Sequence, residues 1–352
     1  MSLLIYGANG YTGTLVAEHA AERRLPLVVA GRSAAEVAAL GARLGVEHRV
    51  FAVEDPAAVD AGIRGARVVL NCAGPFVRTA EPVVSACLRA RVPYLDVTGE
   101  IAVFQALAAR DAEARAASIM VLPGAGFDVV PSDCLAAHVH GRLPTATRLR
   151  LAFRALGQMS RGTALTTVSA AGQGGLVCRG GVVTAVPAGH QTIAVDFGRG
   201  PRKAIAIPWG DVFTAHVTTG IPDVEVFIAV PLGLRVGMRL TRVMGPLLAS
   251  GPVQRLLAAR IRAGAPGPTA EERQRGRSFL WAEARDPSGA TVISRLETPE
   301  GYELTRLTAV ALAERALRGE GRPGFQTPAR AFGKDFILGF PGVRREDVVT
   351  GP

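Results

Sequence analysis

Three glycines near the N-terminus have the spacing of a phosphate-binding turn. The run Gly7-Ala8-Asn9-Gly10-Tyr11-Thr12-Gly13 follows a short apolar stretch and opens a helix-like one. Glycines so placed allow a tight turn and let backbone N–H groups approach a pyrophosphate, which the positive end of the helix dipole also attracts. The run predicts a dinucleotide site held by Gly7, Asn9, Gly10, Tyr11, Thr12 and Gly13. The alternative is a glycine-rich turn without a ligand.

The turn after the second apolar stretch indicates which dinucleotide binds. Residues 26–31 run into Gly31-Arg32-Ser33, and no acid stands at this tip. An acid there hydrogen-bonds the ribose of NAD, whereas an arginine pairs with the 2′-phosphate of NADP. Arg32 and Ser33 therefore favour NADP(H) as the cofactor. Ser33 also stands three residues before Glu36, which is the spacing of a helix capping box, and the two roles are compatible.

A small-residue turn follows the fourth apolar stretch, in the run Asn71-Cys72-Ala73-Gly74-Pro75-Phe76. Such a turn at the carboxyl end of a parallel strand lets the ribose and nicotinamide pass close to the backbone. Cys72, Ala73, Gly74 and Pro75 are therefore further candidates for cofactor binding. We interpret Cys72 as a packing residue rather than a nucleophile, because no histidine lies near it in the sequence.

The next two strand ends carry the groups that can move a proton. Asp96, Thr98 and Glu100 follow one stretch, and the run from Gly124 to Asp133 follows the next. The candidates for proton transfer are Asp128, Glu100 and Ser132, although a carboxylate at a strand end is as often a helix cap. The candidates for substrate contacts are Phe76, Thr98, Phe127, Arg161 and Trp209.

The sequence lacks the residue patterns that several other catalytic mechanisms and metal sites require. None of the four tyrosines has a lysine four residues later, which argues against the tyrosine–lysine pair of short-chain dehydrogenases. Cys134 is the only cysteine near the expected domain junction and is a weak candidate nucleophile. The six histidines do not group with metal-ligand spacing, so no metal site is predicted.

The pattern of elements that must position these residues changes near residue 130. Short apolar stretches at 2–6, 26–31, 48–53, 66–71, 93–97 and 118–122 alternate with helix-like segments at 11–24, 34–44, 56–63, 80–91 and 102–116. Asp55-Pro56 marks one helix start. This alternation predicts an α/β fold, with an N-terminal Rossmann-type doubly wound parallel sheet over residues 1–130.

Residues 131–322 are expected to form a second α+β domain with a mixed or antiparallel sheet, for substrate binding or dimerisation. Strand-like patterns occur at 149–153, 224–230, 279–285 and 291–296, and helix-like ones at 162–173 and 303–318. Residues 266–277 have the composition of a polar loop. The C-terminal segment, 323–352, is expected to pack back toward the first domain.

The chain of 352 residues carries a formal charge of +10, almost all of it from arginine. The excess of positive charge has two possible origins. One is a biased amino-acid composition, and the other is an anionic partner, such as a phosphorylated cofactor, an acyl-carrier substrate or a membrane surface. The arginines are spread out and aromatics are few, which argues against nucleic-acid binding.

Residues 234–263 contain Leu, Val and Met interleaved with arginines. This composition is typical of a pair of amphipathic helices, which would either touch lipid or pack on the protein core. Without a signal peptide or spanning segment, we expect a cytoplasmic protein, peripheral to a membrane at most.

The runs YGANGYTG, GRS, NCAGPF, YLDVTGE and GFDVVPSD resemble the saccharopine-dehydrogenase-like oxidoreductase family, in its trans-acting enoyl-reductase-like branch. Later runs match the same branch, at 160–164, 208–212, 219–222 and 324–328. The resemblance implies NADP in the first domain and hydride transfer to an enoyl (C=C) or imine (C=N) bond of a small-molecule or carrier-bound substrate. A homodimer is compatible with it. The alternative is a non-catalytic NADP-binding redox sensor or lipid-associated scaffold.

Overall fold

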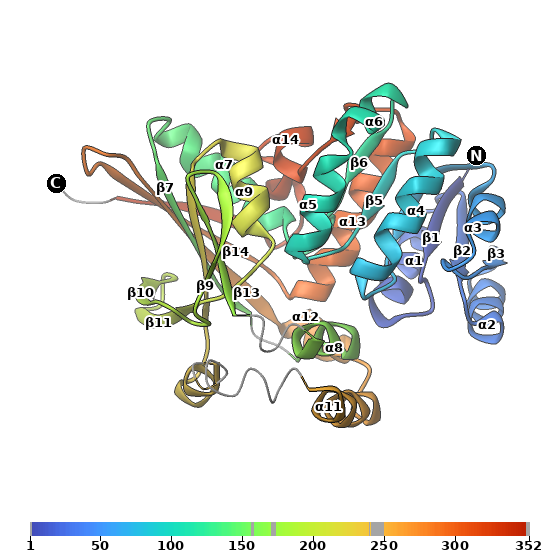
Figure 1. The fold of residues 1–352 in the computed structure, drawn as a ribbon, viewed down its shortest axis with the longest axis horizontal. Helices are drawn as coiled ribbons and strands as arrows, with labels where there is room; N and C mark the ends of the chain where they lie inside the picture. The colour runs from blue at the N-terminus through green and yellow to red at the C-terminus, as the bar shows by residue number, and fades with distance from the viewer. Residues whose placement is uncertain (1, 156–157, 170–173, 239, 241–249, 350–352) are drawn as a thin grey trace. The chain divides into compact units, whose positions relative to one another are not determined.

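The chain forms two compact units in the computed structural model (Figure 1), which describes residues 2–155, 158–169, 174–238, 240 and 250–349. The first unit comprises Met1–Val130 and Tyr302–Phe332, and the second comprises Pro131–Gly301 and Gly333–Pro352. Two expectations need correction. Residues 302–322, expected in the second domain, belong to the first unit. Of the C-terminal segment 323–352, expected to pack back toward the first domain, residues 323–332 belong to the first unit but residues 333–349 belong to the second.

The first unit contains a parallel sheet with the strand order β15-β6-β5-β4-β1-β2-β3. Its strands are β1 (Ser2–Tyr6), β2 (Leu27–Gly31), β3 (Glu47–Val50), β4 (Ala66–Asn71), β5 (Tyr94–Asp96), β6 (Met120–Leu122) and β15 (Gly324–Phe325). The order reverses between β1 and β4, and in open parallel sheets ligands bind outside the carboxyl ends of the strands at such a switch point. The predicted Rossmann-type sheet is thereby confirmed.

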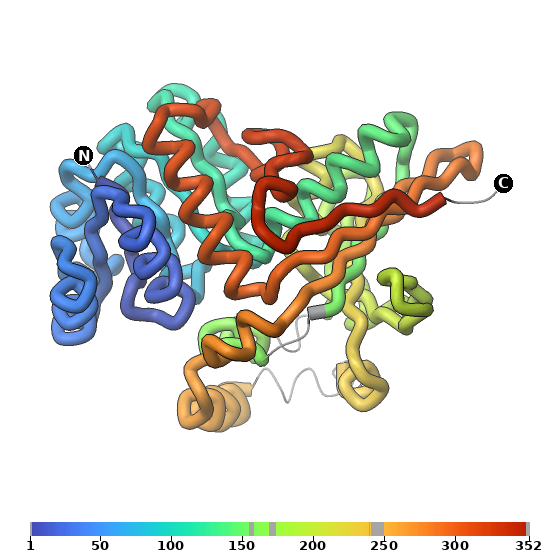
Figure 2. The backbone as a smooth tube through the Cα atoms, turned by 180° about the vertical axis from the view of Figure 1, so that it is seen from behind, coloured from blue at the N-terminus to red at the C-terminus, as the bar shows by residue number. Residues whose placement is uncertain are grey.

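Helices cover both faces of this sheet, which explains why its central strands are continuous apolar runs. Leu3, Leu4 and Ile5 of β1 are all fully buried. Figures 1 and 2 show α4 and α5 on one face and α1 with α13 on the other. The helices of this unit are α1 (Tyr11–Glu22), α2 (Ala34–Leu44), α3 (Pro56–Ile63), α4 (Phe76–Ala90), α5 (Ile101–Ala109), α6 (Asp111–Ala116), α13 (Gly301–Leu317) and α14 (Pro328–Phe332).

Of the two predicted helix starts, one forms as expected. The Asp55 carboxylate accepts the N–H groups of Ala57 and Ala58 at 3.0 and 3.2 Å, with Pro56 in the first turn of α3. The capping box at Ser33 is wrong, because the Ser33 hydroxyl makes no capping bond. Glu36 instead accepts the side-chain amide of Asn9 at 2.6 Å, so it does not bond back to the helix start.

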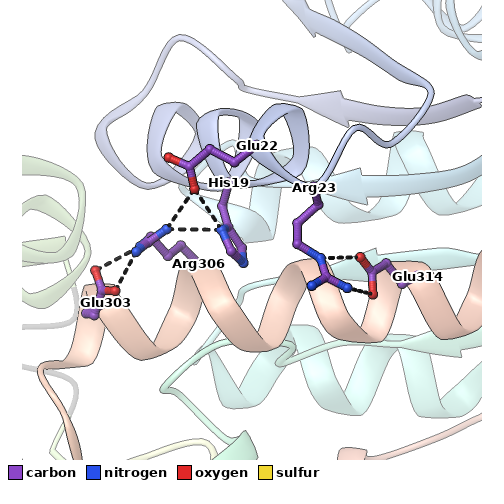
Figure 3. Close-up of polar contacts among 6 residues, drawn as sticks. All are labelled: His19, Glu22, Arg23, Glu303, Arg306 and Glu314. Atoms are coloured by element: carbon purple, nitrogen blue, oxygen red, sulfur yellow. Dashed lines mark hydrogen bonds and ion pairs between the residues drawn. The ribbon is translucent and has the colours of Figure 1, made fainter. Parts of the chain in front are cut away.

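Helix α13 comes from the last sixth of the chain and is tied to α1 by ion pairs. Arg23 donates two hydrogen bonds to Glu314, at 2.8 and 3.1 Å (Figure 3). Near the start of α13, Arg306 contacts Glu303, Glu22 and the ring of His19 (Figure 3). Each exposed pair contributes only about 0–1 kcal/mol. The buried face of α13, which includes Leu304, Val310 and Leu312, contributes more by leaving water.

Two threonines of α13 also hold the loop after β6. The Thr305 hydroxyl accepts the N–H of Phe127 at 2.9 Å, and the buried Thr308 hydroxyl donates to the carbonyl of Ala125 at 2.8 Å. The loop that carries Asp128 therefore depends on a helix almost 180 residues away in the sequence.

The second unit is built on a mixed sheet in the order β10-β11-β12-β7-β13-β14-β16, with β8 paired to β12 and β9 to β8. Among the described strands of this second sheet, only β12 and β7 pair in parallel, and the other pairs are antiparallel. This confirms the predicted class of the second domain. Its strands are β7 (Arg148–Ala155), β8 (Gly175–Arg179), β9 (Val182–Val186), β10 (Thr192–Asp196), β11 (Pro201–Ala206), β12 (Asp223–Ala229), β13 (Arg277–Arg285), β14 (Thr291–Pro299) and β16 (Arg344–Val348).

The core under one end of this sheet contains Phe227, Phe279 and Trp281. The helices of this unit are α7 (Val130–Arg142), α8 (Arg161–Ser169), α9 (Asp211–Thr219), α11 (Gly251–Ala263), α12 (Ala270–Arg275) and a 3₁₀ turn at Phe336–Gly339. The loop expected at 266–277 is wrong, since it contains α12. A capping box between Thr269 and Glu272 starts this helix.

The segment predicted as a helix pair is described in part. Residues 232–238 are helical, and α11 has no buried residue. Arg239 and Arg242, two arginines of the segment 234–263, lie outside the described residues, as do residues 170–173 of the helix expected at 162–173. Within the described parts of the chain, each helix is too short or too polar to cross a membrane.

Replacing Thr308 by valine tests whether α13 is integral to the first unit. The variant keeps the shape of the side chain but removes the donor to the buried Ala125 carbonyl. We expect the free energy of unfolding in urea to fall by about 1–3 kcal/mol. Thr184→Val, at an exposed hydroxyl that donates to the Val182 carbonyl, is the matched control and should change little. Equal stability of both variants would show that α13 is held without this bond.

Candidate active site

The glycine run forms the turn between β1 and α1 and fits a pyrophosphate. Gly7 has φ +77°, and a Cβ there would lie 2.7 Å from Ala73, while a Cβ at Gly13 would collide with the Gly7 carbonyl oxygen. Gly10 is exposed at the helix start. The first turn of α1 has no acidic residue, and no side chain caps it. The first turn therefore has no negative charge that would repel an anion, as the predicted cofactor requires.

The end of β2 presents Arg32 to solvent. This arginine makes no hydrogen bond or ion pair to any residue that the structure describes, and Ser33 beside it makes no capping bond. Both side chains can therefore turn toward a 2′-phosphate without breaking an existing contact. An unpaired guanidinium is well suited to a phosphate, since it offers two parallel N–H donors.

The turn after β4 lies beside the glycine loop, and hydrogen bonds to the N–H and the carbonyl of Ala73 fix its conformation. The Asn71 carboxamide oxygen accepts the N–H of Ala73 at 3.0 Å, and the Thr79 hydroxyl donates to the Ala73 carbonyl at 2.5 Å. Because Gly7 approaches Ala73 so closely, the two loops meet at the switch point of the sheet. Cys72 is half-buried there, and burial raises the pKa of its thiol above the ordinary range, so it is not a reactive thiolate.

A buried carboxylate joins the ends of three strands. Asp96, at the end of β5, accepts the Tyr94 hydroxyl at 2.8 Å and the N–H groups of Thr98 and Gly124 at 3.0 Å each. Asn71 of β4 donates to the same Tyr94 oxygen at 3.3 Å. Burial raises the pKa of Asp96 to about 6, although the three hydrogen bonds oppose the shift. The arrangement fixes the ends of these strands relative to one another.

Asp128 is the candidate acid that the structure leaves available. Its half-buried carboxyl lies against Gly99, where an added Cβ would stand 3.0 Å from one carboxyl oxygen. Burial raises its pKa to about 7, and it has no hydrogen bond or ion pair to a described residue. A carboxyl group with a pKa near neutrality can hold a proton and release it at ordinary pH.

Glu100 has a structural role instead. Its carboxylate accepts the N–H groups of Phe76 and Val77 at 2.9 and 3.0 Å, and so caps the start of α4. Burial raises its pKa, but these bonds favour the ionised form. Thr98 is fully buried, and its hydroxyl accepts the Glu100 N–H at 3.1 Å. Of the substrate candidates in this unit, Phe76 and Phe127 are half-buried.

The remaining predicted residues belong to the second unit. Ser132 is buried in α7. Arg161 donates to the Gly264 carbonyl, and the half-buried Trp209 packs on Phe153 with ring centroids 4.7 Å apart. Their roles toward substrate stay predictions. Cys134 is buried beside the Gly333 carbonyl, and burial raises its pKa, so it is not poised as a nucleophile.

The sequence predicted Asp96 at this rim but did not single out Tyr94, which donates to Asp96. It also did not single out Asn71 and Thr79, which extend the hydrogen bonds from Tyr94 to the Ala73 turn. The signal was present, because alternate residues of one strand, Tyr94 and Asp96, share a face and both are polar in a strand that should be buried. Among the described residues, no group of three His, Cys, Asp or Glu side chains could hold a metal ion.

Comparisons with known proteins identify an NADP binding domain in the first unit. Residues 3–122 match the family model described as the saccharopine dehydrogenase NADP binding domain. A trans-acting enoyl reductase of Mycobacterium leprae is 34% identical over 139 residues, which cover 37% of this chain and 33% of that protein. The human saccharopine dehydrogenase-like oxidoreductase is 33% identical over 153 residues, covering 37% and 35% of the two chains. The matches thus span about a third of these relatives' length.

The likeness in fold extends further than the likeness in sequence. Saccharopine dehydrogenase (L-Glu forming) from Saccharomyces cerevisiae covers 99% of both chains with a TM-score of 0.67, at 13% identity. These findings confirm the resemblance to NADP-binding oxidoreductases of the saccharopine dehydrogenase type, and NADP(H) as the cofactor of the first unit. The later runs led us to expect a match over nearly the whole chain. The sequence matches instead cover only its N-terminal third or so.

Arg32→Ala tests the cofactor assignment. Loss of the guanidinium should weaken equilibrium binding of NADPH about ten- to hundredfold, the range of one charge-assisted bond, and leave NADH binding nearly unchanged. Arg64→Ala, an exposed arginine of the same unit, removes the same charge as a control. If both variants weaken NADPH equally, Arg32 acts only through net charge.

Asp96→Ala tests the junction of strand ends. It leaves the Tyr94 hydroxyl and the N–H groups of Thr98 and Gly124 without their acceptor. Each unsatisfied buried donor costs about 1–3 kcal/mol, so we expect a loss of at least about 3 kcal/mol in the free energy of unfolding. Asp96→Asn retains an acceptor oxygen and should lose less. Similar losses in both variants would show that the charge, not the hydrogen bonds, matters.

Proposed function

We propose that this chain, whose residues 3–122 match a saccharopine dehydrogenase NADP binding domain, is an NADPH-dependent reductase of enoyl or imine substrates. The observation that carries the proposal is Asp128. It is a half-buried carboxyl with a pKa raised to about 7, on the loop after β6, at the edge of the sheet where the nicotinamide end of a dinucleotide belongs.

Bound NADPH supplies a hydride to the electron-poor carbon of the C=C or C=N bond. The protonated Asp128 carboxyl would give its proton to the other atom of that bond, so that the substrate gains one hydride and one proton. NADP⁺ and the Asp128 carboxylate would remain, and solvent would return the proton to Asp128.

The chain's own residues would act mainly by positioning. The glycine turn and Arg32 would hold the two ends of the phosphate-bearing half of the nucleotide. The Ala73 turn, fixed by Asn71 and Thr79, would set the depth at which the nicotinamide lies. Orientation of this kind provides much of the rate in hydride transfer, since the cofactor supplies the chemistry.

The other proton donors are less well supported. Glu100 is committed to the start of α4 through two hydrogen bonds, and protonating it would weaken that cap. Ser132 has an ordinary hydroxyl, which is a far weaker acid than a carboxyl group with a pKa near 7. The names of the relatives, a trans-acting enoyl reductase and a saccharopine dehydrogenase-like oxidoreductase, support reduction as the class of reaction.

A panel of enoyl thioesters and cyclic imines, with NADPH oxidation followed by absorbance, tests the proposal directly. Turnover of either class that depends on NADPH supports it. Tight NADPH binding with no turnover across the panel would favour the non-catalytic sensor or scaffold instead.

Asp128→Asn tests the proton donor with the best substrate of that panel. We expect kcat to fall about 100-fold, within the usual range for a general acid. In the wild type the acid must be protonated, so kcat should fall as the pH rises through about 7, and this dependence should disappear in the variant. Asp60→Asn, at a surface carboxylate paired with Arg89, is the control. An unchanged pH profile in Asp128→Asn would exclude Asp128 as the donor.

A further inference from the structure

The second unit contains a groove that the proposed reaction does not use. Two adjoining hollows of about 340 and 430 Å³ lie along strands β10 and β11 and the helical residues 232–236. They share three lining residues, Lys203, Leu232 and Arg235, and so form one continuous groove. All of its lining residues belong to the second unit.

Four cations line this groove: Arg154, Arg202, Lys203 and Arg235. No acid lines it, and none of the four side chains makes a hydrogen bond or an ion pair to a residue within the described ranges. Several other arginines of the same unit are paired with an acid, as Arg179 is with Glu225 at 2.6 Å. The Nε of Arg235 is buried and has no partner there. Like charges gathered without a counter-charge repel one another, so the groove favours an anion.

Apolar side chains stand beside these cations. Leu232 and Val236 are 66% and 48% exposed, although both line the groove, and Ile193 lies across from them on β10. Exposed leucines are ordinary when single, but a leucine and a valine one helical turn apart next to unpaired cations form an amphipathic surface. An anion alone uses only the charged half of this surface.

We propose that the groove binds the anionic head group of an amphiphile, a phosphate or carboxylate, with its alkyl chain lying over Leu232 and Val236. Lys203 and Arg235 hold the head group, because they line both hollows. Arg154 and Arg202 line the second hollow and surround the head group with further positive charge. The amphiphile is a free acyl compound or a lipid of an anionic membrane, and both present the same chemistry. The site is independent of the proposed reductase activity.

Titration calorimetry with dodecyl phosphate below its micelle concentration tests this site. We expect saturable binding, weakened at least tenfold by the double variant Lys203→Ala/Arg235→Ala. The control double variant Arg255→Ala/Arg260→Ala removes the same charge from the exposed face of α11 and should bind as the wild type does. Unchanged circular dichroism and melting temperature show that each variant is folded.

Three further arms define the ligand. Inorganic phosphate should bind more weakly than dodecyl phosphate, and Leu232→Ser should weaken only the latter. Cosedimentation with phosphatidylglycerol vesicles, lost in Lys203→Ala/Arg235→Ala and absent with phosphatidylcholine, identifies a membrane lipid as the source; dodecyl phosphate binding without cosedimentation identifies a free amphiphile. The proposal is overturned if wild-type binding does not saturate, or if both double variants lose affinity equally.

Discussion

The buried carboxylate of Asp96 is the contact on which the candidate site depends. The ends of parallel strands leave backbone N–H groups without sheet partners, and Asp96 satisfies two of them, on Thr98 and Gly124. Through Tyr94 it also reaches Asn71, which fixes the turn at Ala73. Burying this carboxylate is costly, as its raised pKa shows, and the three accepted hydrogen bonds offset much of that cost. A rigid edge of the sheet results, from which the loop of Asp128 starts.

That edge is completed from a distant part of the chain. Thr305 and Thr308 of α13 bind the loop that follows β6, and Arg23 and Arg306 join α13 to the helix that the glycine turn begins. The nucleotide turn and the candidate acid are therefore supported by one helix. Local opening of α13 would loosen both ends of the site together, because they share its contacts. The first 130 residues alone lack this support.

The sequence predicted the elements of the first sheet well, because each was specified locally. Continuous apolar strands, the proline after Asp55 and the glycine turn need no knowledge of the rest of the chain. The assignment of residues 303–318 to the second domain failed because an amphipathic helix does not state which sheet its apolar face will cover. Strands β8 to β11 were missed since none of them alternates strictly between apolar and polar residues. In the site, the glycine spacing predicted a dinucleotide and Arg32 predicted NADP(H), which the family model supports. The spacing does not show that Glu100 caps a helix whereas Asp128 does not, because that difference depends on distances in the folded chain.

The positions of the arginines and lysines that have no acidic partner help to explain the excess of positive charge. The chain has 40 lysines and arginines against 30 aspartates and glutamates, so a share of its cations must lack an acid. Biased composition alone would scatter these cations over the surface, where water screens them from one another. In the structure, Arg32 instead lies unpaired at the end of β2, and four unpaired cations line one groove of the second unit without an acid among the lining residues. Such grouping raises the electrostatic free energy of the free protein and lowers that of a complex with an anion. The 2′-phosphate of NADP(H) and the proposed amphiphile are anions that would lower this free energy.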